Sequence, residues 1–149
     1  DVQIDLDATC YIPDEYISDS SQKIEIYQDI ALCKNEEDIQ NVIDEMIDRF
    51  GNMPSEIENL IEIARIKILC KKLNISKVQG KRSFAVFTFG EFNIDVNELA
   101  KNYRNRIKFS QGLKPQITYV LQNATGMKML KEVEEFLKTI DDFKIKENK

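Results

Sequence analysis

The feature that most constrains the fold is the stretch 38–73, in which two helical patterns meet at a short corner, residues 48–54. On both sides of the corner, apolar residues recur at the three-and-four spacing of one helix face. Gly51 stands where a helix C-cap favours a left-handed backbone, and Pro54 stands at or just ahead of the next helix's first turn. We therefore predict a packed helical hairpin whose corner is fixed by Phe50, Gly51 and Pro54. The apolar positions are Ile39, Val42, Ile43, Met46, Ile47 and Phe50 before the corner, and Ile57, Leu60, Ile61, Ala64, Ile68 and Leu69 after it.

The remaining patterns predict an α+β fold, with N-terminal helices followed by a small β-sheet and packed helices. Residues 1–18 read as an extended N-terminal arm or the end of a preceding linker, 19–140 as one α+β domain, and 141–149 as a charged tail. Because the chain starts at Asp1 without a Met, we expect a fragment of a longer protein or a processed product. Strand 83–89 carries apolar residues on both faces, so we expect it to be central and covered on both sides.

Several catalytic chemistries are excluded by residue type. The chain has no histidine, which removes Ser-His-Asp and Cys-His catalysis and His-ligated metals. It has no glycine-rich phosphate loop, and its three cysteines lack the CxxC spacing of a zinc site. We therefore expect no enzymatic activity and no catalytic, cofactor-binding or metal-binding residue. The sparse cysteines favour a reducing cytoplasm, and no apolar run approaches the roughly 20 residues of a membrane span.

The charge balance disfavours nucleic-acid binding by this chain. The net charge is −5, and lysines and arginines are interspersed with acids. One local basic cluster occurs, and a solvated helix end explains it better than a phosphate-binding patch; it consists of Lys101, Arg104, Arg106 and Lys108. We therefore do not expect DNA binding by the chain alone.

Several motifs, in one order and spacing, resemble the C-terminal regulatory domain of the bacterial transcription-repair coupling factors (Mfd). The resemblance is strongest between residues 7 and 80, and the later strands and final helix agree in pattern only. The motifs are Ile12-Pro13-x-x-Tyr16-Ile17, Lys23-Ile24-x-Ile26-Tyr27-x-x-Ile30-Ala31, Glu45-Met46-Ile47-Asp48-Arg49-Phe50-Gly51-x-x-Pro54, Asn59-Leu60-x-x-Ile63-Ala64-Arg65-Ile66-Lys67 and Leu73-x-Ile75-x-Lys77-Val78-x-Gly80.

The resemblance implies a role in DNA repair. Proteins of this family are ATP-dependent DNA translocases that displace stalled RNA polymerase and recruit UvrA for nucleotide excision repair. In them this domain is non-catalytic and autoinhibitory: it packs on the N-terminal UvrB-like module and masks the UvrA-binding surface. The resemblance therefore implies direct contact with that module, and only indirect contact with UvrA and RNA polymerase. It places ATP and Mg²⁺ in the motor domains and implies no cofactor in this chain.

Three charged residues of the corner motif are candidates for the partner contact. With the apolar positions turned inward, Glu45, Asp48 and Arg49 project away from the core. From the residues alone, a local Glu45–Arg49 ion pair on a solvated helix face explains them better than a partner contact does. Their place in the family motif leads us to expect partner-binding residues. Two alternatives stay open: a stand-alone protein-binding adaptor, or a nucleic-acid accessory domain that uses the basic cluster together with Tyr103.

Overall fold

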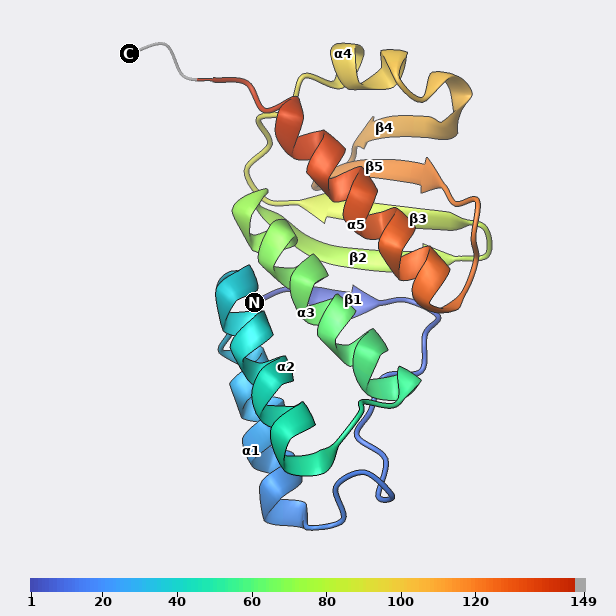
Figure 1. Cartoon of the computed structure of the whole chain (residues 1–149). Helices are drawn as coiled ribbons and strands as arrows, with labels where there is room; N and C mark the ends of the chain where they lie inside the picture. The colour runs from blue at the N-terminus through green and yellow to red at the C-terminus, as the bar shows by residue number, and fades with distance from the viewer. Residues whose placement is uncertain (147–149) are drawn as a thin grey trace.

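The computed structural model describes residues 1–146, in which a helical layer packs beside a helix-covered β-sheet (Figure 1). The predicted α+β class is confirmed: apart from one short strand in the N-terminal arm, the helices of the N-terminal half come first, and the sheet follows with further helices packed on it. The elements in order are β1 (Gln3–Asp5), α1 (Ser20–Ala31), α2 (Glu36–Phe50), α3 (Ser55–Lys72), β2 (Ile75–Lys81), β3 (Phe84–Phe89), α4 (Val96–Lys101), a 3₁₀ turn (Arg104–Arg106), β4 (Ile107–Gln111), β5 (Pro115–Val120) and α5 (Gly126–Asp142).

The sheet has the strand order β1-β2-β3-β5-β4, so β3 is central, as its apolar content predicts. β1 runs parallel to β2, and the other neighbours are antiparallel. Both α3 and α5 cross the same face of the sheet (Figure 1), where Ala85, Phe87 and Phe89 are buried. On the opposite face Phe84 is 42% exposed and Val86 is only half-buried. Within the described residues, the expectation that β3 is covered on both sides is therefore wrong, because both long helices pack on one face.

The helix α3 is shared by two hydrophobic clusters. Ile57, Ile61 and Ala64 belong to the cluster formed with α1, α2 and the N-terminal arm. Ile66 and Cys70 belong to the larger cluster under the sheet and α5. The sequence predicted one apolar side for this helix, but apolar residues cover two sides of it. The reason is that α3 packs against α1 and α2 on one side and against the sheet and α5 on the other.

The helix α2 buries a narrower face than its apolar periodicity predicts. On α2, Ile39, Val42 and Met46 are buried, and Phe50 is half-buried. Ile47 is 43% exposed, so its inclusion in the inward apolar face is wrong. Successive helical residues are rotated by about 100°. Ile47 is therefore turned away from the stripe that Met46 buries.

Both ends of the described chain are tied into the domain. In the arm, Ile12 and Ile17 are buried in the helical cluster, and β1 joins the edge of the sheet. At the other end, α5 continues past residue 140 to Asp142, and Ile94 forms a β-bridge with Lys144. The expected tail 141–149 thus begins inside a helix, and residues 147–149 lie outside the described part of the chain.

Candidate partner-binding site

The predicted partner-binding residues lie on α2, whose start is capped by local side chains. The side chain of Asn35 accepts a 2.8 Å hydrogen bond from the N–H of Asp38. The carboxylate of Asp38 in turn accepts a 2.9 Å bond from the N–H of Lys34. Three acids occupy the first helical turn, where the helix dipole favours negative charge. The local sequence therefore dictates where α2 begins.

The end of α2 is the predicted corner. Gly51 has φ +89° and ψ −166°, a backbone region that is essentially restricted to glycine. Pro54 occupies the N-cap of α3 with φ −71°, just ahead of the first helical residue. Phe50 is half-buried, and its ring centroid lies 5.8 Å from that of Tyr16 in the N-terminal arm. The corner thus consists of local turn chemistry together with one aromatic contact from the arm.

Glu45, Asp48 and Arg49 are all exposed on this last part of α2. The guanidinium of Arg49 lies 3.1 Å from the Glu45 carboxylate on the same helix and 3.6 Å from that of Glu25 on α1. It also lies 4.9 Å from the centroid of the Phe50 ring, within cation–π range. The local Glu45–Arg49 pair is therefore present, and it does not exclude a partner contact, because the three side chains remain accessible.

The structure adds two acids from α1 that the sequence reasoning missed. Glu25 reaches Arg49 directly, and Asp29 lies close enough to be influenced by both Glu25 and Glu45. Burial raises the pKa of Asp29, and the nearby carboxylates of Glu45 and Glu25 raise it further. No periodicity in the sequence signals this grouping, because it depends on the antiparallel register of two helices. The surface that carries the predicted residues, which we call the α2 face, is therefore mainly acidic; it consists of Glu25, Asp29, Glu45, Asp48 and Arg49.

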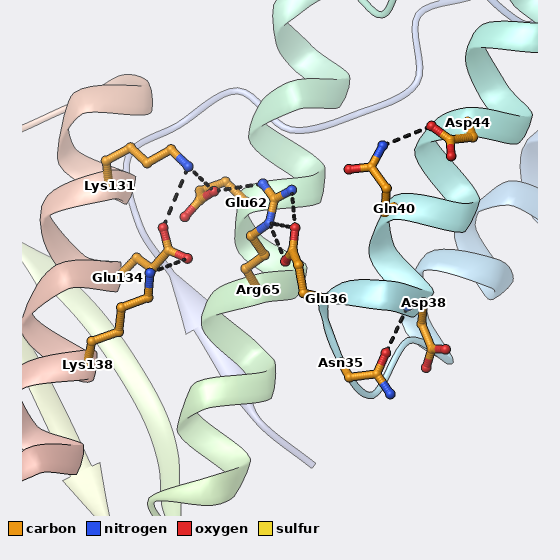
Figure 2. Close-up of polar contacts among 10 residues, drawn as sticks. All are labelled: Asn35, Glu36, Asp38, Gln40, Asp44, Glu62, Arg65, Lys131, Glu134 and Lys138. Carbon is orange, nitrogen blue, oxygen red and sulfur yellow. Dashed lines mark hydrogen bonds and ion pairs between the residues drawn. The ribbon is translucent and has the colours of Figure 1, made fainter.

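A second charged group connects α2, α3 and α5 (Figure 2). Arg65 on α3 donates to both carboxylate oxygens of Glu36 at 2.9–3.2 Å and to Glu62 at 3.1 Å. Lys131 on α5 donates to Glu62 at 2.8 Å and lies 3.6 Å from Glu134. An open groove of about 520 Å³ runs beside these side chains. Its charges alternate and satisfy one another, which indicates a structural connection between helices.

Glu62 is the buried centre of this network. Its side chain is completely inaccessible to solvent, and its Oε2 has no hydrogen-bond partner among the described residues. Burial raises the pKa of Glu62, and the neighbouring Glu134 raises it further, while Lys131 opposes the shift. A carboxylate in this position requires cationic neighbours to remain charged. Arg65 and Lys131 supply that compensation, so the network serves to hold a buried carboxylate between the helices.

The four residues of the predicted basic cluster do not act as one patch. Lys101 pairs with Glu98 at 2.7 Å. Arg106 donates a 2.7 Å hydrogen bond to the hydroxyl of Tyr119 and lies 3.5 Å from Glu132. Arg104 and Lys108 remain exposed. Because Arg106 is used inside the domain, the structure weakens the nucleic-acid alternative.

Metal-binding and membrane-spanning features are both missing from the described chain. Residues 1–146 contain no grouping of three or more His, Cys, Asp or Glu side chains that is suited to hold a metal ion. Among the same residues, no helix has the length and apolar character needed to cross a membrane.

Comparison with known proteins identifies relatives along most of the chain. A family model, the TRCF domain, matches residues 6–99. The transcription-repair-coupling factor of Rickettsia prowazekii is 35% identical over 138 residues, which are 92% of this chain and 12% of that protein. The proteins of the same name from Bacillus subtilis and Escherichia coli are 30% and 31% identical, over 97% and 89% of this chain. The chain spans 12–13% of the length of these relatives.

The fold agrees with these matches. A crystal structure of the C-terminal domain of transcription-repair coupling factor superposes with a TM-score of 0.78 at 25% identity, covering 96% of this chain and 93% of that one. The family model, the relatives and the solved structure all carry the same family name. This chain therefore belongs to the transcription-repair-coupling factor family, and it matches the C-terminal domain of those proteins.

Proposed function

We propose that this chain is a non-catalytic, autoinhibitory domain that restrains a longer DNA-repair translocase. In this proposal its α2 face packs on the N-terminal UvrB-like module of the same polypeptide and covers the surface that binds UvrA. Contact with UvrA and RNA polymerase is indirect, through the rest of the protein. We assign it to the cytoplasm, where its free cysteines Cys10, Cys33 and Cys70 would remain reduced.

The observation that supports this proposal is the exposed charged end of α2, beside a corner that is hydrogen-bonded to the N-terminal arm. Glu45, Asp48 and Arg49 are accessible, while Gly51 and the arm hold the helix end in one geometry. Charged contacts determine the register of an interface and break more readily than an apolar seal, which suits a contact that must be released. A partner carboxylate would compete with Glu45 and Glu25 for the fork of Arg49, and partner arginines would pair with the acids.

The proposal is tested with the triple variant Glu45→Ala, Asp48→Ala and Arg49→Ala. Binding of this domain to the separately expressed N-terminal module should fall at least about tenfold, which corresponds to roughly 1.4 kcal/mol. In the intact protein, UvrA capture without RNA polymerase should rise. The melting temperature of the domain should change little, because the lost pairs are exposed.

A matched control removes another exposed i,i+4 pair from the same helix. Gln40 donates a 2.8 Å hydrogen bond to Asp44 in the first half of α2 (Figure 2). The variant Gln40→Ala and Asp44→Ala should bind the N-terminal module like the wild type. Wild-type binding by the triple variant would show that the contact with the module lies elsewhere.

A further inference from the structure

The sheet has a face that no helix of the described residues covers, which we call the open sheet face. Side chains alternate between the two faces of a strand, so Phe84 and Val86 point away from the buried Phe87. Residues directly opposite one another on paired strands share a face. The register therefore assembles the open sheet face from Phe84, Val86, Val120, Lys77, Lys81 and Lys108.

The centre of this face is apolar. Phe84 on the central strand is 42% exposed, and its cross-strand partner Val120 is half-buried. Val86 lies two residues further along the same strand and is also half-buried. The apolar residues that led us to expect a second cover on β3 are therefore present, and the cover is absent from residues 1–146.

The rim of this face is basic, although the whole chain has a net charge of −5. Lys81 pairs opposite Phe84, and Lys108 pairs opposite Thr118, which itself lies opposite Val86. Lys77 lies on the same face of β2, opposite Thr88. Within the described strands, Asp5 is the acid on this face, opposite Gln79. The charge of the open sheet face is thus opposite to that of the mainly acidic α2 face.

We propose that the open sheet face binds an acidic surface, with a small apolar centre, on another domain of the longer polypeptide. The three lysines select acidic side chains, and Phe84 and the two valines provide the apolar contact. An apolar centre of three side chains gives modest affinity to a freely diffusing partner. Tethering in one polypeptide raises the effective concentration to the millimolar range, which makes such a contact effective. Relatives are long enough for this arrangement, since this chain spans 12–13% of their length.

Two other occupants fit the face less well. Single-stranded nucleic acids stack successive bases on several aromatic side chains, and Phe84 is the single aromatic side chain that the five described strands present on this face. A second copy bound through a twofold axis would place the same basic patch against itself. Lysines would then face lysines, which is unfavourable.

The test places the photo-crosslinking residue benzoylphenylalanine at position 84 of the intact longer protein. The control position is 113, because Leu113 is fully exposed at the β4–β5 turn and lies outside this face. We expect position 84 to crosslink to an Asp- and Glu-rich peptide of another domain of the same polypeptide. The yield should fall when salt is raised, because exposed charges are then screened. This arm of the test requires no charge variant and no assumption about the α2 face.

The second arm reverses the charges with Lys77→Glu, Lys81→Glu and Lys108→Glu together. The crosslink from position 84 should fall about fivefold or more, because attraction becomes repulsion. A matched control changes the net charge equally at exposed lysines outside the face: Lys34→Glu, Lys67→Glu and Lys71→Glu. It should leave the yield near the wild-type value.

Four results would overturn the proposal. They are a yield at position 84 no higher than at position 113, a crosslink to nucleic acid, a crosslink to a second copy, and an equal loss in the control triple variant. The melting temperature of each variant identifies losses that arise from unfolding. If a lysine variant is unfolded, the salt dependence of the crosslink in the protein with its lysines intact tests the charged contact, and a yield independent of salt would also overturn the proposal.

Discussion

The hydroxyl of Tyr16 donates a 2.6 Å hydrogen bond to the carbonyl oxygen of Gly51, which joins the N-terminal arm to the end of α2. The same hydroxyl lies 3.2 Å from the carbonyl oxygen of Met46 on that helix. Carbonyls at the C-terminal end of a helix lack helical partners and need other donors, and Gly51 is the C-cap of α2. Tyr16 provides one, and its ring also contacts Phe50. The arm therefore stabilises the corner on which the proposed partner-binding residues lie.

Removing this hydroxyl should weaken the domain modestly. Tyr16→Phe keeps the ring and loses the hydrogen bond, so we expect a loss of about 0.5–1.5 kcal/mol in the free energy of unfolding. Urea unfolding monitored by circular dichroism measures the change. Tyr11→Phe, at a ring that is 48% exposed, is the control and should change stability less. Equal effects in the two variants would contradict a specific role of the Tyr16 hydroxyl.

The backbone of Gly51 should tolerate no side chain without strain. Gly51→Ala should cost about 1–3 kcal/mol, although a Cβ there would have open space, because φ is +89°. A Cβ added at Gly112 would also meet open space, and the φ of Gly112 is not in the positive range. Gly112→Ala should therefore be near neutral. Thermal melting of both variants separates backbone strain from the general effect of replacing glycine with alanine, and a neutral Gly51→Ala would remove the conformational argument for the corner.

Removing the cations around the buried Glu62 should destabilise the domain more than removing Glu62 itself. Changing Arg65 and Lys131 together to Met leaves a buried carboxylate uncompensated, at a cost of at most about 3–5 kcal/mol. Glu62→Met removes the buried charge, and Arg65 keeps Glu36 as a partner. We expect that variant to be near neutral or more stable. Guanidinium unfolding of both variants is the measurement, and the reverse ranking would refute this interpretation of the network.

Glu132 should make the domain sensitive to acid. Burial acts to raise the pKa of Glu132, but hydrogen bonds from Tyr119, Gln122 and Asn123 outweigh it and hold the pKa below its ordinary value. A lowered folded-state pKa contributes stability above the unfolded value of about 4.5, and this contribution disappears as pH falls through the folded value. Glu132→Gln should therefore melt below the wild type near neutral pH, and the gap should narrow in acid. Melting temperatures of both proteins, measured from neutral pH into acid, provide the check. A difference in melting temperature that does not change with pH would contradict the role of the Glu132 carboxylate.

Local chemistry explains what could be predicted of the corner. Gly51 and Pro54 act through their own backbone preferences, so their positions are readable without knowing any distant contact. The helix periodicity similarly indicates Ile39, Val42 and Met46 as core residues. It fails at Ile47, because whether a residue at the edge of an apolar stripe is buried depends on the neighbouring helix.

The sequence by itself determined the α+β order, the capped helices, the central apolar strand and the family motif, since each depends on residues close together in the chain. The tertiary structure alone decided which distant groups meet. Tyr16 reaches Gly51, Lys131 reaches Glu62 across 69 positions, and Glu25 reaches Arg49. It also left Phe84 uncovered, because α3 and α5 share one face of the sheet. Such pairings depend on the packing of helices and strands in three dimensions, and no periodicity along one chain encodes them.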